Sequence, residues 1–170
     1  LDALGSFTLG HEIAPEPADD VTATTASNTI TLSWSVTSDT EDGKAYAYKA
    51  YVASDAKALG NLNPKEIADT VLVATVKVGT LPVGATLSAT LDDLGFDTDY
   101  YYTVVAYDYQ NNYSAPSGIQ SIRTGQNAAP AVTTDYTGDY RIRPFDKITV
   151  EYAVSDPDGH DFTIETDPRS

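Results

Sequence analysis

The sequence predicts an all-β fold: a seven-stranded Greek-key β-sandwich followed by a partial second β-domain. Short runs in which Val, Ile, Thr and Tyr alternate with other residues recur between clusters of Gly, Asn, Asp and Pro. This is the pattern of antiparallel strands. Hydrophobic residues make up 41% of the 170 residues, which is enough to form a core. Helical patterns are nearly absent.

Each predicted strand places its apolar residues on one face. Residues 29–36 form the clearest run, because the even positions are apolar and the odd positions carry hydroxyl groups. In the run 46–52, the inward set is expected to be Tyr48, Ala50 and Val52. Further strands are expected at 71–78, 85–91, 100–106 and 119–124. The predicted core consists of Ile30, Leu32, Trp34, Tyr48, Ala50, Val52, Leu87, Leu91, Leu94, Tyr100, Tyr102, Val104 and Ala106.

One segment has the sequence of a helix start. Asn63 can act as N-cap, Pro64 follows at the first helical position, and Glu66 stands at the third. The sequence therefore predicts one or two helical turns over residues 63–68.

The composition excludes several classes of partner and chemistry. The chain has 10 Lys and Arg against 25 Asp and Glu, for a formal net charge of −15. This balance argues against binding to nucleic-acid phosphates and to anionic lipid. With no cysteine, disulfides and thiolate chemistry are impossible. We expect no signal peptide at the start and no membrane insertion, because no apolar run approaches the roughly 20 residues of a membrane span.

A change of composition divides the chain. Residues 126–130 read as a linker, because small, polar and Pro residues gather there. Residues 131–170 read as the N-terminal part of a second β-domain, with strands expected at 147–154 and 161–166. Two strands are at best marginally stable alone. We therefore expect residues 129–170 to be poorly ordered or to pack on another copy of the chain.

Residues 14–125 resemble a fibronectin type III domain. A Pro-rich leader at 14–17 precedes residues 21–23, as such leaders precede the first strand of that family. Leu32-Ser33-Trp34 is similar to its second strand, and residues 94–100 match its Leu-x-x-x-Thr-x-Tyr corner. Residues 106–117 are similar to the Ala-x-Asp-x-x-Gly-Asn-x-Ser-x-Pro-Ser turn of many bacterial members, with Asn111 in place of the usual Gly. The resemblance implies an immunoglobulin-like sandwich in which the Trp is core and the corner Tyr bonds nearby backbone.

Two shorter resemblances flank this domain. Residues 1–13 read as the tail of a preceding domain or a linker, and residues 1–7 look like the last helix of subtilisin-like protease domains. Residues 129–132 and 150–159 resemble cadherin-like or immunoglobulin-like repeats of secreted bacterial proteins. Together these resemblances imply a secreted or surface-exposed bacterial protein whose fibronectin-like module follows a subtilisin-like serine protease domain.

Catalysis by this chain is not expected. His11 and His160 are its only imidazoles, neither lies near a nucleophile motif, and no Gly-x-Ser-x-Gly elbow occurs. The acid pairs Glu41-Asp42, Asp92-Asp93 and Asp97-Asp99 lie in predicted turns and at strand ends, where carboxylates are solvated and accept backbone hydrogen bonds. The predicted function is a non-catalytic spacer and interaction module, whose partners are protein domains of the same parent chain.

Two ligand hypotheses remain beside this one. Asp156, Asp158 and Asp161 surround a Gly turn and could direct oxygens at Ca²⁺, although a plain hairpin turn with Asp-Gly at its tip explains the same residues. No other cofactor is expected. Tyr107, Tyr109 and Tyr113, together with Tyr46 and Tyr51, could stack on sugar rings, as in an accessory carbohydrate-binding module of a polysaccharide-degrading system. The simpler interpretation is that tyrosines alternate on half-buried strands.

Overall fold

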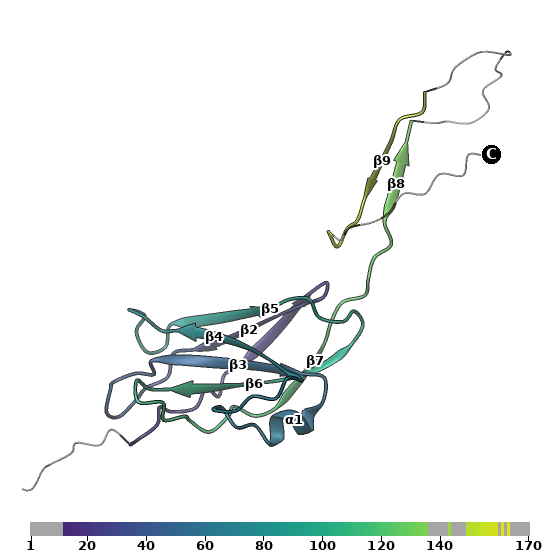
Figure 1. Ribbon diagram of the computed structural model, residues 1–170. Coiled ribbons are helices and arrows are strands. Elements are labelled where there is room, and N and C mark those ends of the chain that lie inside the picture. Colours follow the sequence, from purple (N-terminus) through teal and green to yellow (C-terminus); the bar gives the residue numbers. More distant parts are fainter. Residues whose placement is uncertain (1–11, 136–142, 144–148, 160, 162, 164–170) are drawn as a thin grey trace, which may run out of the picture. The chain divides into compact units, whose positions relative to one another are not determined.

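The computed structural model describes residues 12–135, 143, 149–159, 161 and 163. Its contacts divide the chain into two compact units, residues 1–126 and residues 127–170. Within the first unit, two antiparallel sheets face each other (Figure 1). The smaller sheet has the order β1-β2-β5, formed by Thr22–Ala26, Thr29–Ser35 and Thr86–Leu91. The larger sheet has the order β4-β3-β6-β7, formed by Val71–Lys77, Ala47–Ala53, Asp99–Tyr107 and Gln120–Arg123.

This arrangement confirms the predicted all-β sandwich. The core lies between the two sheets and contains every residue that the alternation placed there, with Tyr100 partly buried at its margin. Trp34 is 2% exposed and packs against Tyr48 of the facing sheet, with 5.5 Å between ring centroids. Register follows the hydrophobic pattern because a slip by one residue would turn each apolar face toward water.

The helix lies elsewhere than the sequence predicts. It is α1 (Ala56–Gly60), which begins after Asp55, whose side chain accepts from the backbone N–H of Lys57. In the segment predicted as helical, Asn63 accepts from Lys65 N–H two residues on and closes a tight turn with Glu66. The prediction over 63–68 was therefore wrong, because the Asn side chain caps a turn rather than a helix.

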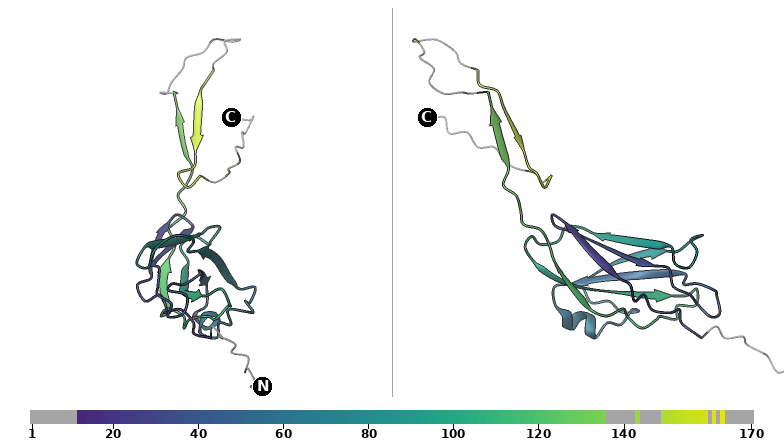
Figure 2. Two further views of the ribbon diagram at one scale, coloured as in Figure 1. Left: turned by 90° about the vertical axis from the view of Figure 1, so that its left-hand side faces the viewer. Right: turned by 180° about the vertical axis from the view of Figure 1, so that it is seen from behind.

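The position of α1 is set by burial. Leu59 is 2% exposed and packs with Tyr51, Val71 and Val105 on the outer face of the larger sheet, against which α1 lies in Figure 2. A second apolar cluster thus forms outside the main core, and sheet alternation alone does not reveal it. Among the described residues, no helix is long and apolar enough to cross a membrane.

The chain enters and leaves this sandwich at opposite ends. At the end that we call the N-terminal pole, Glu16 N–H donates to the carbonyl of Ser38, in the loop that follows β2. At the other end, the C-terminal pole, Gly125 N–H donates to the carbonyl of Ser27, in the turn that precedes β2. The two poles are therefore separated by the length of β2, roughly 23 Å for seven residues.

Two details implied by the fibronectin type III resemblance are present. The hydroxyl of Tyr100 accepts from Gly95 N–H at 2.9 Å, so the corner tyrosine bonds nearby backbone as expected. Asn111 has a φ of 63°, the left-handed conformation that Gly would adopt at this position.

The second unit contains a two-stranded antiparallel sheet of β8 (Ala131–Thr134) and β9 (Tyr152–Ser155). β9 overlaps the strand predicted at 147–154, whereas β8 was not predicted. The strand predicted at 161–166 lies almost wholly outside the described residues. Val132 is 66% exposed and Tyr152 is 55% exposed.

Candidate functional site

The loops of the N-terminal pole carry the residues of chemical interest. The β2–β3 loop and the β4–β5 loop are joined by Val36 N–H donating to the Ala85 carbonyl and Gly84 N–H donating to the Val36 carbonyl. The β6–β7 loop lies at the same pole, because β6 ends there at Tyr107, opposite the start of β3 at Ala47. Two groups of side chains meet here, one acidic and one aromatic.

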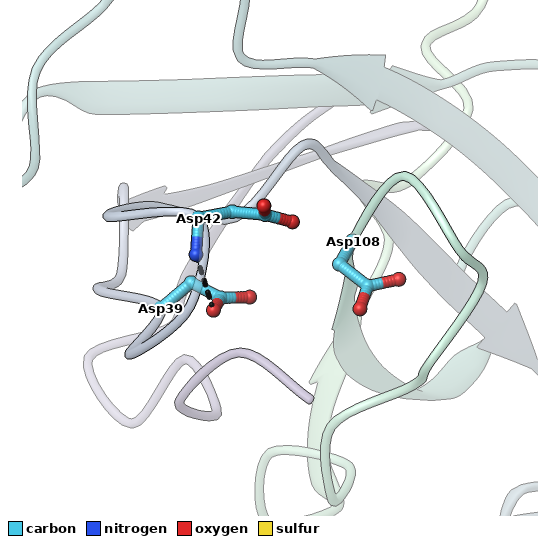
Figure 3. Close-up of side chains that lie close together, drawn as sticks. All are labelled: Asp39, Asp42 and Asp108. Carbon is cyan, nitrogen blue, oxygen red and sulfur yellow. Dashed lines mark hydrogen bonds between the residues drawn. The ribbon is translucent and has the colours of Figure 1, made fainter. Parts of the chain in front are cut away.

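The acidic group consists of Asp39, Asp42 and Asp108, which we call the aspartate cluster (Figure 3). One carboxylate oxygen from each residue lies within 4.8 Å of one from each of the others. Asp39 and Asp42 belong to the β2–β3 loop, whereas Asp108 follows β6. Asp39 is 4% exposed and Asp108 is 1% exposed, while Asp42 is exposed. Oxygen-only ligands of this kind suit a hard cation.

Hydrogen bonds fix the two buried carboxylates. Oδ1 of Asp39 accepts from the backbone N–H groups of Glu41 and Asp42, at 2.8 and 3.1 Å. Oδ1 of Asp108 accepts from Gln110 N–H and Asn112 N–H, both at 2.8 Å. These bonds form because a turn follows each Asp, and a carboxylate at the first position of a turn can accept from the amides two to four residues on.

The aromatic group consists of Tyr46, Tyr107, Tyr109 and Tyr113, which we call the tyrosine band. The rings of Tyr46 and Tyr109 lie 4.0 Å apart, and those of Tyr107 and Tyr113 lie 5.3 Å apart. The rings of Tyr46 and Tyr107 lie at 80° to each other with 6.1 Å between their centroids, and this contact links the two pairs. Lys49 lies over Tyr113 and Lys77 over Tyr46, at 5.1 and 5.7 Å from the ring centroids, which is a favourable arrangement for a cation on an aromatic face.

The predicted stacking tyrosines differ in their accessibility. Tyr109 is 69% exposed and lines a cavity of about 120 Å³ with Asp42, Tyr46 and Lys77. Tyr107 is only 9% exposed, and burial raises its pKa, with a smaller contribution from Tyr113. Tyr51, which the sequence placed on the same exposed face, is fully buried. Tyr109 therefore offers the most accessible ring of the band to a ligand.

The residues of the predicted calcium loop lie in the second unit. Asp156 accepts from Asp158 N–H at 2.8 Å, and its carbonyl accepts from Gly159 N–H, so these residues form a turn with Gly159 at a φ of 77°. Asp158 accepts from Ala128 N–H at 2.6 Å. Among the described residues, Asp156, Asp158 and Asp161 do not form a group with converging oxygens. Calcium binding at this loop stays a prediction.

The remaining titratable residues singled out from the sequence are dispersed. Asp97 and Asp99 both bond Arg123, at 2.9 and 2.8 Å, and Arg123 lowers the pKa of Asp97. They therefore serve as partners of a guanidinium rather than as an acid and a base. His11 and His160 lie outside the described residues.

Sequence reasoning missed the pairing of Asp39 with Asp108. Asp108 stands in the turn motif that carried the family resemblance, and Asp39 opens the acidic segment 39–42. Each Asp precedes a turn, which is the signal that was available. Their proximity follows only from the topology that brings the β2–β3 and β6–β7 loops to one pole.

Solved structures of other proteins are similar to part of this chain. No protein-family model matches the sequence, and no curated relative is found. The crystal structure of chicken CNTN1 FN1-FN3 domains is similar at 21% identity, covering 66% of this chain and 32% of that one, with a TM-score of 0.46. The fn3 domain of human collagen alpha-1(XX) chain has 20% identity, 75% and 98% coverage and a TM-score of 0.44. The FN5 domain of Drosophila Lar has 18% identity, 65% and 97% coverage and a TM-score of 0.42.

The fold follows from the sheets themselves. A three-stranded sheet β1-β2-β5 faces a four-stranded sheet β4-β3-β6-β7, the corner tyrosine bonds backbone at Gly95, and a tryptophan fills the centre of the core. The first unit of the chain therefore has a fibronectin type III-like, immunoglobulin-like β-sandwich fold.

Proposed function

We propose that this chain is a non-catalytic spacer and interaction module of a larger secreted or surface-exposed bacterial protein. The observation that carries the proposal is the separation of the two poles. The incoming segment is held at the N-terminal pole by Glu16, and the outgoing segment is held at the C-terminal pole by Gly125. A module of this kind adds its own length between its neighbours and separates them along the strand direction.

The charge of the chain fits an extracytoplasmic spacer. A formal net charge of −15 keeps such a module soluble and discourages non-specific association. The resemblance of residues 1–7 to the end of a subtilisin-like catalytic domain favours a serine protease as the parent protein. Those residues lie outside the described part of the structure. The resemblance of residues 129–132 and 150–159 favours further cadherin-like or immunoglobulin-like modules as neighbours.

The spacer function is tested by exchange in the full-length parent protein. Replacement of residues 12–126 by an unrelated fibronectin type III sandwich should leave the activity of the parent unchanged, because only the length and the placement of the ends matter. Deletion of the same residues should lower that activity. If replacement impairs the parent as much as deletion does, the surface of this module has a specific role and the spacer proposal fails.

A carbohydrate-binding function is the second candidate, and the exposed ring of Tyr109 favours it. This ring stacks on Tyr46 beside a small cavity that also has a carboxylate and an ammonium group. Such a pairing of a flat apolar surface with polar groups suits a sugar ring.

Self-association through residues 129–170 also stays a proposal. It is favoured by the exposed apolar side chains of Val132 and Tyr152.

Glycan binding can be measured by affinity electrophoresis of the chain in soluble polysaccharides. If the second candidate is right, Tyr109→Ala should weaken retention roughly fivefold, since one stacked aromatic contributes about 1 kcal/mol. Tyr152→Ala is the matched control, because Tyr152 is also exposed but lies outside the tyrosine band. Equal retention of both variants, or no retention of the unaltered chain, would dismiss this function.

A further inference from the structure

The aspartate cluster contains a buried carboxylate oxygen without a partner. Oδ2 of Asp39 is inaccessible to solvent and has no hydrogen-bond partner among the described residues, although Oδ1 of the same carboxylate accepts two bonds. Figure 3 shows this second oxygen directed toward Asp108. Burying part of a carboxylate without a compensating interaction is costly, and buried charges are normally paired or coordinate metals.

Within the described part of the chain, no ion pair to Asp39 or Asp108 is formed. Among the described residues, the ion pairs are those of Arg123 with Asp97 and Asp99, and neither Asp39 nor Asp108 takes part in one. Lys44 lies close to the cluster in sequence, but its ammonium group donates to the carbonyls of Gly79 and Leu81. No described side chain therefore supplies a positive charge to the two buried carboxylates, Asp39 and Asp108.

Asp108 is rigidly presented to the same space. Its two oxygens accept from Gln110 N–H, from Asn112 N–H and from the Asn112 side-chain amide. A carboxylate has about four lone-pair sites, so three accepted bonds leave one for a further ligand. The cluster thus combines one oriented oxygen from Asp39, one fixed carboxylate from Asp108, and Asp42 on the solvent side.

The donor set and its spacing point to one ion. All three ligands are carboxylate oxygens, whereas zinc and copper prefer sites that include nitrogen or sulfur ligands. Two oxygens bound to one Ca²⁺ at about 2.3–2.6 Å can lie up to about 5 Å apart, whereas for Mg²⁺ at about 2.0–2.1 Å the limit is about 4.2 Å. The oxygens of the cluster lie within 4.8 Å of one another, which is inside the limit for two oxygens on one Ca²⁺, whereas Mg²⁺ requires every pair to lie within about 4.2 Å. The exposure of Asp42 leaves room for water molecules to complete the coordination.

We propose that Asp39, Asp42 and Asp108 bind one Ca²⁺ ion at the N-terminal pole of the sandwich. The ion neutralises the unpartnered oxygen of Asp39 and joins the β2–β3 loop to the β6–β7 loop. The β2–β3 loop also holds the incoming segment, through Glu41 accepting from Ile13 N–H and Ser38 accepting from Glu16 N–H. Calcium therefore stabilises the pole at which this module is joined to the preceding part of the chain. The site is independent of the spacer function and can be present or absent without it.

Calorimetric titration of the chelator-treated, full 170-residue chain with CaCl₂ tests the proposal. We expect one Ca²⁺ to bind with a Kd of about 10⁻⁴–10⁻³ M, the range of extracellular modules, and the melting temperature to rise in millimolar Ca²⁺. Mg²⁺ should bind more weakly. Asp39→Asn should weaken Ca²⁺ binding at least tenfold. The variant keeps an oxygen that can accept from Glu41 and Asp42, so its fold without Ca²⁺ should be intact by circular dichroism.

Two control variants locate the ion. Asp92→Asn removes one exposed carboxylate from the loop after β5, at the opposite pole, and should leave binding unchanged. Asp158→Asn distinguishes the aspartate cluster from the loop at Asp156, Asp158 and Asp161, because it should leave binding at the aspartate cluster unchanged. The proposal is overturned if no Ca²⁺ binds at millimolar concentration, or if Asp39→Asn binds as tightly as the unaltered chain.

Discussion

Replacement of Trp34 by Ala is expected to lower the free energy of unfolding by about 3–5 kcal/mol. Trp34 is 2% exposed and lies between the two sheets, where its ring packs against Tyr48. Its removal loses the transfer free energy of a large aromatic side chain and leaves a cavity that the paired strands cannot close. Urea denaturation followed by far-ultraviolet circular dichroism measures the change.

Two variants on the same strand make this test specific. Ser33→Ala changes the neighbouring residue on the opposite face and should alter stability by no more than about 0.5 kcal/mol. Trp34→Phe should cost less than Trp34→Ala, because it keeps an aromatic ring and removes an indole N–H that has no hydrogen-bond partner among the described residues. If Trp34→Ala unfolds at the same urea concentration as the unaltered chain, the assignment of Trp34 to the core is wrong.

Stability is expected to fall steeply above about pH 10. Burial raises the pKa of Tyr48, Tyr51, Tyr102 and Tyr107 above the ordinary tyrosine value of 10.0. Above that pH the unfolded chain loses phenolic protons that the folded chain retains, so the unfolded state binds fewer protons and stability falls as pH rises. The contribution is complete below about pH 10. Above it, each tyrosine that stays neutral only in the folded state lowers the free energy of unfolding by up to about 1.4 kcal/mol per pH unit.

Urea denaturation at a series of pH values, with the ultraviolet absorbance of tyrosinate as a second signal, measures this effect. The part of the tyrosinate signal that comes from these four buried tyrosines should appear together with unfolding rather than before it. Tyr51→Phe should make the decline shallower, because it removes one of the four titrating groups, and its hydroxyl has no hydrogen-bond partner to lose among the described residues. Full ionisation of the tyrosines while the chain stays folded would contradict the expectation.

The sandwich could be predicted because its strands are encoded locally. The run 29–36 alternates so regularly that one face had to be buried, and the observed core places Ile30, Leu32 and Trp34 as expected. Register was fixed by the same alternation, and the corner at Tyr100 was recognisable from a short motif. These features depend on neighbours within a few residues, which a single sequence displays.

The helix and the burial of Tyr51 could not be predicted in the same way. Capping residues occur at both Asp55 and Asn63, and the choice between them depends on which segment can bury an apolar side chain. The packing of Leu59 on the outer face of the larger sheet favours the helix that begins after Asp55. This is a tertiary contact, which a local sequence pattern cannot predict. The same contact covers Tyr51, which alternation had assigned to an exposed face.

The candidate site likewise has one part that the sequence predicted and one part that it did not. Tyr109 was singled out because tyrosine offers a flat apolar face with a polar tip, and it is exposed. The aspartate cluster was not found, because it unites two loops that are far apart in sequence and each reads as an ordinary turn. The acidic loop at Asp156 attracted attention because its acids are adjacent in sequence, but adjacency does not ensure that oxygens converge.

The placement of the two ends has a mechanical consequence. β1 begins at the N-terminal pole and pairs with β2, whereas β7 ends at the C-terminal pole and pairs with β6. Tension between the flanking parts of the chain therefore pulls each of these strands along its own axis. The hydrogen bonds of each ladder are then loaded together in shear, instead of being opened one after another as in the peeling of a hairpin. Under tension, the module is built to resist extension as one unit rather than to unravel strand by strand.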